Sequence, residues 1–113
     1  MTIEITAPPD PGSDTARRYG YIAALSAAEH VLSTTPVIPT DVTIQCAPWD
    51  GGPLLRIHFH NAPDAVRAFS EAFGGTVTEE EGRDGETRHT TAVGVVAGLP
   101  FEAWAVTRIG GAE

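Results

Sequence analysis

The chain has 113 residues, 42% of them hydrophobic and 19% charged, and a formal net charge of -8. This length can bury one hydrophobic core without disulfides or metals, so we predict a single domain of residues 13–109 between an N-terminal arm, residues 1–12, and a tail, residues 110–113. All seven basic residues are arginines and they form no basic stripe, so we expect neither nucleic acid nor a membrane surface as a partner.

The compartment is predicted from cysteine use and hydropathy. Cys46 is the one cysteine, which excludes an internal disulfide and is typical of a reducing compartment. The chain opens without a basic segment followed by an apolar one, and no apolar run reaches membrane-spanning length. We therefore expect a cytoplasmic protein.

The N-terminal half is expected to form a helix and two strands. The helix begins at an N-cap residue among Ser13, Asp14 and Thr15 and runs to about Ser33, before two prolines. Five apolar residues at helical spacing predict its buried stripe: Tyr21, Ile22, Leu25, Ala28 and Leu32. Residues 42–46 and 54–60 then alternate between apolar and polar side chains, which predicts a hairpin of two strands.

The C-terminal half is expected to form a helix and three strands. Asn61 is the predicted N-cap, Val66, Phe69 and Phe73 the buried stripe, and Gly74 the end of this helix. Strands follow at residues 76–80, 86–96 and 101–108. The order α-β-β-α-β-β-β predicts a two-layer α+β fold, with two helices packed on a mostly antiparallel five-stranded sheet.

The last two strands carry apolar residues on both faces, more than two helices can cover. Val93 alternates with Ala92, and Trp104 with Phe101. Such strands indicate a surface for a protein partner, and we predict a homodimer. Trp104 is a candidate core or partner-interface residue. Trp49, in a loop between prolines, either anchors a partner interface or folds back over the core.

His58 and His60 are the most chemically suggestive pair in the chain. Alternation along the strand puts both imidazoles on one face, a spacing that can ligate zinc or iron. A metal site needs a third ligand, and His89 and Glu102 are the candidates. Alternatively, the two histidines belong to the solvated face of a half-buried strand and the protein needs no cofactor.

Residues 54–108 read β-α-β-β-β, with the segment Phe-Gly-Gly-Thr-Val at residues 73–77 in the middle. This pattern resembles one module of the vicinal-oxygen-chelate superfamily, the glyoxalase and antibiotic-resistance type. The resemblance implies that a histidine of the first strand, His58 or His60, and Glu102 of the last strand bind a divalent metal. Two such modules normally face each other, whereas the N-terminal part here is a helix and a strand.

A second resemblance covers residues 19–108. The segments Thr-Pro-Val-Ile-Pro at residues 35–39 and Gly-Leu-Pro-Phe-Glu at residues 98–102 are similar to those of short uncharacterised proteins of actinobacteria and their phages. That resemblance implies no activity.

No catalytic residues are predicted, because the chain lacks a nucleophile elbow, a phosphate loop and a dinucleotide fingerprint. We expect a non-enzymatic protein-interaction or regulatory module. The alternative is a metal-dependent enzyme or small-ligand binder that uses His58, His60 and Glu102.

Overall fold

The computed structural model describes residues 13–47 and 52–109. The elements along the chain are α1 (Asp14–Thr34), β1 (Asp41–Gln45), β2 (Leu54–His58), α2 (Pro63–Phe73), β3 (Thr76–Glu81), β4 (Thr87–Val96) and β5 (Leu99–Arg108). This confirms the predicted order α-β-β-α-β-β-β. The predicted arm, the predicted tail and Trp49 lie outside the described residues.

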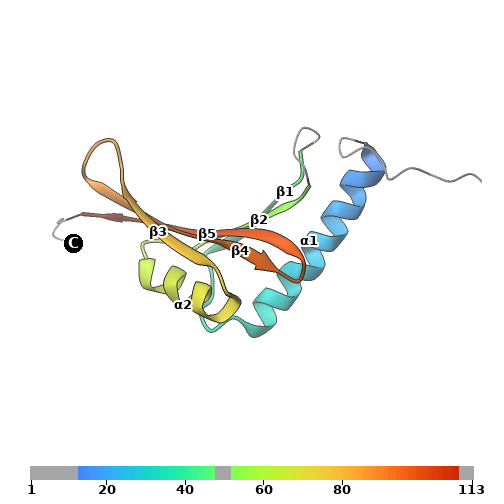
Figure 1. The fold of residues 1–113 in the computed structure, drawn as a ribbon, viewed down its shortest axis with the longest axis horizontal. Helices are drawn as coiled ribbons and strands as arrows, with labels where there is room; N and C mark the ends of the chain where they lie inside the picture. The colour runs from blue at the N-terminus through green and yellow to red at the C-terminus, as the bar shows by residue number, and fades with distance from the viewer. Residues whose placement is uncertain (1–12, 48–51, 110–113) are drawn as a thin grey trace, which may run out of the picture.

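The five strands form one sheet in the order β1-β2-β5-β4-β3. Only the central β2–β5 pair is parallel, and the other neighbours are antiparallel, so the sheet is mixed and mostly antiparallel as predicted. Both helices lie on the same side of the sheet, α1 over the β1–β2 side and α2 over β4 and β5 (Figure 1). Among the residues that the structure describes, helices therefore cover one sheet face and leave the other uncovered.

The core lies between the helices and the covered face. Alternation along β2 turns Leu55 and Ile57 inward, and both side chains are fully buried. From α2, Phe69 enters the same layer, with its ring centroid 5.2 Å from that of Phe101 and 5.8 Å from that of Phe59. The stripe of α2 is buried at Val66 and Phe69, as its spacing predicts, and Phe73 is half-buried.

Local capping explains where the helices begin and end. The Ser13 hydroxyl accepts a hydrogen bond from the Ala16 N–H at 3.1 Å and caps α1. Gly74 ends α2 in the left-handed region, at φ 84°, which glycine adopts without strain. The prediction for Asn61 is wrong: Ala62 is the N-cap and makes no side-chain hydrogen bond. Asn61 itself has φ 54°, so it serves the turn before the helix.

The predicted stripe of α1 is also wrong, except for Ala28. The helix turns small residues toward the sheet: its buried positions are Gly20, Ala24, Ala27, Ala28 and Val31. The larger residues face outward, with Leu25 60% and Ile22 53% exposed. A close approach explains this, because a Cβ added at Gly20 would lie 2.8 Å from Cys46 Sγ.

No helix within the described residues is long and apolar enough to cross a membrane.

Candidate functional site

The uncovered side of the sheet gathers most of the residues that the sequence singles out. Because β2 and β5 are parallel neighbours, Arg56 lies beside Glu102 and His58 beside Trp104. Their strand neighbours Leu55, Ile57, Phe101 and Ala103 point into the core, so these four side chains point away from it. We call Arg56, His58, Glu102 and Trp104, with Val93 and Val106 of the same side, the open face.

His58 is held on two sides. Its ring stacks on the Trp104 ring with centroids 4.1 Å apart and planes at 20°. Its Nδ1 lies 3.1 Å from Asp41 Oδ2, where a proton on Nδ1 is donated to the carboxylate. The antiparallel register that pairs Asp41 with His58 brings the two together. The His58 side chain is 19% exposed, so the imidazole is a fixed part of the surface.

Arg56 and Glu102 form the second contact of the open face. Arg56 Nε donates to Glu102 Oε1 at 2.9 Å, and the side chains are 38% and 32% exposed. The guanidinium carbon of Arg56 lies 5.5 Å from the Trp104 ring centroid, within the range of a cation–π contact. Trp104 is therefore flanked by His58 and Arg56, which restrict its rotamers.

Apolar and acidic side chains surround this centre. Val93 pairs in register with Glu102 and is 48% exposed, and Val95, on the same side of β4, is 60% exposed. Acidic residues stand on both outer strands of this side, Asp41 on β1 and Glu80 on β3. The open face thus has an aromatic and aliphatic centre with carboxylates at its margins.

The predicted metal ligands are brought only partly together. His58 and Glu102 share the open face on neighbouring strands, and the His60 ring lies 6.1 Å from that of His58. His89 is on β4, and β5 separates that strand from β2. Within the described ranges no group of three His, Cys, Asp or Glu side chains is arranged to hold a metal ion.

The donor set also fits a metal poorly. The Glu102 carboxylate already accepts from Arg56, and a guanidinium at that distance repels a divalent cation. The Asp41 carboxylate likewise engages His58 Nδ1. Arg56 is paired with Glu102 and His58 with Asp41, so the residues present suit surface recognition better than metal chemistry.

The sequence pattern singled out His58, Glu102 and Trp104 as candidates, but it did not indicate Asp41 as a partner of His58. Whether Asp41 pairs with His58 depends on the register of the predicted hairpin. The long loop between its two strands leaves that register open. The ion pair of Arg56 with Glu102 depends on β2 lying beside β5. That pairing joins residues 46 apart, which no local pattern shows.

Comparison of the chain with models of known protein families, with curated proteins and with solved structures found no match.

Proposed function

We propose that this protein is a non-enzymatic interaction module whose open face binds a protein partner. The observation that carries the proposal is Trp104, a tryptophan held half-exposed at the middle of an uncovered sheet by His58 and Arg56. Tryptophan and arginine are the residue types that contribute most to protein–protein binding energy. Because their side chains are already ordered, binding costs less conformational entropy.

The charge of the molecule indicates the chemistry of that partner. The chain carries a formal net charge of -8, and Asp41 and Glu80 stand at the margins of the open face. The complementary surface has an apolar centre and a basic rim. Charges at the rim mainly accelerate association, so the association rate should fall as salt is raised.

The test is affinity capture from a lysate of the source organism with two matched variants. Trp104→Ala removes the central side chain of the open face. Tyr19→Ala removes an aromatic that is 65% exposed on α1, which lies on the other side of the sheet. We expect a basic protein that the wild type and Tyr19→Ala retain and Trp104→Ala loses, with both variants folded by circular dichroism.

Two results would refute the proposal. One is a partner that Trp104→Ala retains as well as the wild type does. The other is a wild-type protein that captures nothing specific at low salt.

A metal-dependent enzyme or small-ligand binder of vicinal-oxygen-chelate type is the second candidate. It is supported by the strand order, which puts His58 and Glu102 on one face of adjacent strands. We favour the first proposal because the Glu102 carboxylate already accepts a hydrogen bond from Arg56. Metal analysis of protein purified without a histidine tag separates the two: a stoichiometric ion whose addition raises the melting temperature would favour the enzyme.

A further inference from the structure

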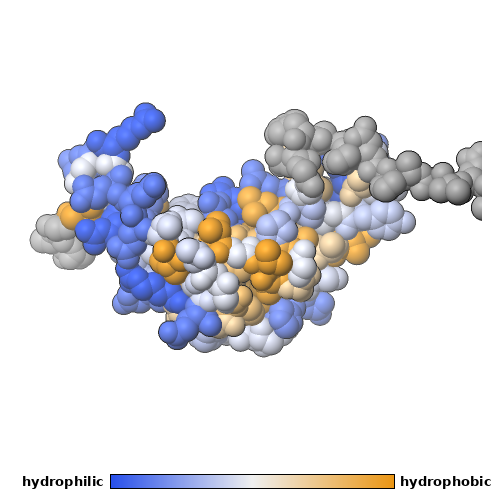
Figure 2. All heavy atoms as spheres, viewed as in Figure 1, coloured by the Kyte–Doolittle hydropathy of each residue, from blue (hydrophilic) through white to orange (hydrophobic). Residues whose placement is uncertain are grey.

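The outward side of α1 is an apolar surface that nothing in the described protein covers. Leu25, Ile22 and Leu32 are 60%, 53% and 49% exposed, and Tyr21 beside them is 39% exposed. In Figure 2 hydrophobic and weakly polar residues mix over α1, whereas the far end of the β3–β4 hairpin is strongly hydrophilic. An exposed apolar stripe of this kind marks an interaction site.

The spacing of the exposed residues is that of a helix-pairing seam. Five outward-facing residues follow one another at intervals of four, three, four and three positions: Arg18, Ile22, Leu25, Glu29 and Leu32. This alternation is the a/d pattern by which two helices pack side by side. We call these five residues the α1 seam. It carries apolar residues at its middle and one charge of each sign toward its two ends.

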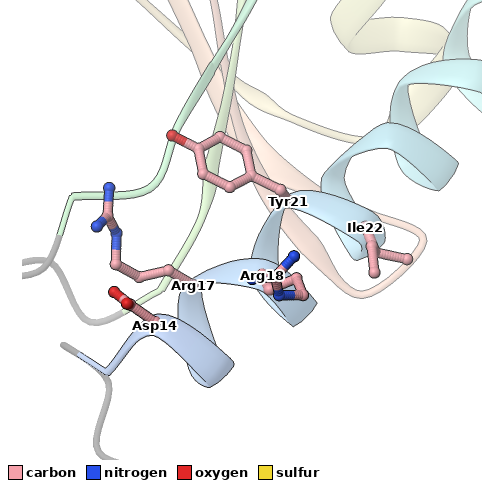
Figure 3. A pocket seen from close by; sticks show the side chains of 5 residues that line it. All are labelled: Asp14, Arg17, Arg18, Tyr21 and Ile22. Carbon is pink, nitrogen blue, oxygen red and sulfur yellow. The ribbon is translucent and has the colours of Figure 1, made fainter.

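The seam points away from the other helices and strands that the structure describes. The sheet-facing side of α1 is marked by its buried Ala24, Ala27 and Val31. The side toward α2 is marked by His30, whose ring lies 6.3 Å from that of Phe73. In Figure 3, Tyr21 projects toward the strands, whereas Ile22 is turned away from them. A second helix can therefore lie along the seam without meeting the sheet or α2.

We propose that two copies of this chain pair through the α1 seam, with the helices antiparallel. The two-fold axis lies between the two helices, at the level of Ala23 and Ala24 along each of them. It sets each Ile22 opposite the partner's Leu25. The same axis sets each Arg18 opposite the partner's Glu29. Both contacts occur twice, as an isologous interface requires.

Charge selects a second copy, and it selects the antiparallel direction. In a parallel pair each Arg18 would face the partner's Arg18 and each Glu29 the partner's Glu29, so like charges would meet at both ends. The antiparallel pair replaces both repulsions with attractions. One stripe thus complements itself in shape and in charge, which an unrelated partner would match only by chance.

The area available fits a reversible dimer. The exposed fractions of Ile22, Leu25 and Leu32 correspond to roughly 300 Å² per copy, within the range of the largest apolar patches on soluble monomers. Pairing covers this area on both copies. This apolar total alone is below the roughly 1,000 Å² expected of a stable interface, and Arg18 and Glu29 add polar area at its ends, so we expect a weak, reversible monomer–dimer equilibrium.

The N-terminal end of the seam has room for a partner side chain. Asp14, Arg17, Arg18, Tyr21 and Ile22 line an open depression of about 330 Å³ there (Figure 3). In the antiparallel pair the partner's Leu32 comes opposite Thr15, at this end of the helix. The depression therefore admits the last apolar side chain of the partner's seam.

This inference does not rest on the proposed function. The open face and α1 lie on opposite sides of the sheet, so pairing through α1 leaves Trp104 accessible. A dimer of this kind presents two open faces, and each could engage a partner independently.

Sedimentation equilibrium of the full chain, from low to high micromolar concentration, tests the proposal. We expect the wild type to dimerise reversibly. Arg18→Glu sets a glutamate opposite the partner's Glu29 at both ends, and we expect about tenfold weaker association. Glu29→Arg should weaken it similarly. The double variant Arg18→Glu with Glu29→Arg exchanges the charges and should restore the wild-type dissociation constant within about threefold, by the same pairing energies.

Leu25→Asp is the complementary variant, because it buries two carboxylates at the middle of the seam. It should be monomeric while keeping the wild-type circular dichroism, since Leu25 is exposed in each copy. A wild type that is monomeric throughout would overturn the proposal. So would a dimer that persists in Leu25→Asp, a charge exchange that fails to restore association, or a dimer lost with Trp104→Ala but not with the α1 variants.

Discussion

The two helices of this protein cover the same sheet in opposite ways. In α2 the large residues face inward: Val66 and Phe69 are fully buried. In α1 the inward side is made of glycine, alanine and one valine, and the large residues Ile22 and Leu25 face outward. A helix can thus be held to a sheet by small side chains that permit close approach, leaving its larger ones for another contact.

This difference separates two roles. Burial of a large apolar side chain contributes about 1.5–3 kcal/mol, so α2 stabilises the fold strongly at each inward position. The small inward residues of α1 gain less from burial, and its large outward residues are only partly covered in the single chain. We infer that α2 mainly serves the core, whereas α1 serves both the core and association.

Phe69→Ala should cause the largest loss of stability. The ring is fully buried among Phe59, Phe73 and Phe101, so its removal leaves a cavity that these neighbours cannot fill. We expect a loss of about 3–5 kcal/mol in the free energy of unfolding, measured by urea titration. Phe73→Ala is the matched control on the same helix and should cost less, because Phe73 is half-buried. Equal losses of stability in the two variants would contradict a larger contribution from the fully buried Phe69.

Ala24→Leu tests the close approach of α1. Ala24 is fully buried against the sheet, and the added carbons must displace the helix or the strands beneath it. We expect a loss of about 1–3 kcal/mol in the free energy of unfolding. The neighbouring Ala23 is exposed, so Ala23→Leu should be nearly neutral. A neutral Ala24→Leu would show that α1 packs loosely.

Leu25→Ser should barely change the stability of the single chain. Its side chain is 60% exposed, so at high dilution we expect the free energy of unfolding to stay within about 0.5 kcal/mol of the wild type. At high concentration the wild type should melt at a higher temperature than at low concentration, and the variant should lose this dependence. A large loss at high dilution would instead mean that Leu25 packs within one chain.

Asp84→Asn, outside both helices, should have the smallest effect. In the turn between β3 and β4, Asp84 Oδ1 accepts from the Glu86 N–H at 2.8 Å, and chiefly this bond holds the Asp84 pKa below its usual value. A lowered pKa stabilises the fold above the unfolded-state pKa and loses that effect as the pH falls through the folded-state pKa.

The wild type should therefore be slightly more stable than Asp84→Asn at neutral pH, and the two should converge in strong acid. Urea titrations at both pH values measure this. A difference that persists in strong acid would mean that Asp84 acts through something other than its charge.

Local features of the sequence predicted the elements well. Ser13 caps α1 and Gly74 ends α2 because capping depends on a few neighbouring residues. The buried stripe of α2 was predicted because all of its large apolar residues lie on one helical face. In α1, two stripes share the helical period, one of small residues and one of large ones, and periodicity does not say which faces the sheet.

The site depended on pairing between distant segments. Alternation alone placed Arg56 and His58 on one side of their strand, as the structure has them. The contacts of His58 with Trp104 and of Arg56 with Glu102 required β5 to lie beside β2, although α2, β3 and β4 intervene in the chain. Such long-range pairing is set by packing of the whole sheet.

Distances between spin labels test the pairing of two α1 helices most directly. Ser26 and Ser33 are exposed on one flank of the α1 seam, so each can be replaced by cysteine and carry a spin label. Cys46→Ala removes the native thiol from both labelled variants. With a rise of 1.5 Å per residue, the antiparallel pair separates two labels at position 33 by about 30 Å along the axis and two at position 26 by less than about 10 Å. Antiparallel pairing requires a clearly longer distance at position 33 than at position 26. Equal distances at both positions, or no dipolar coupling at either, would contradict it.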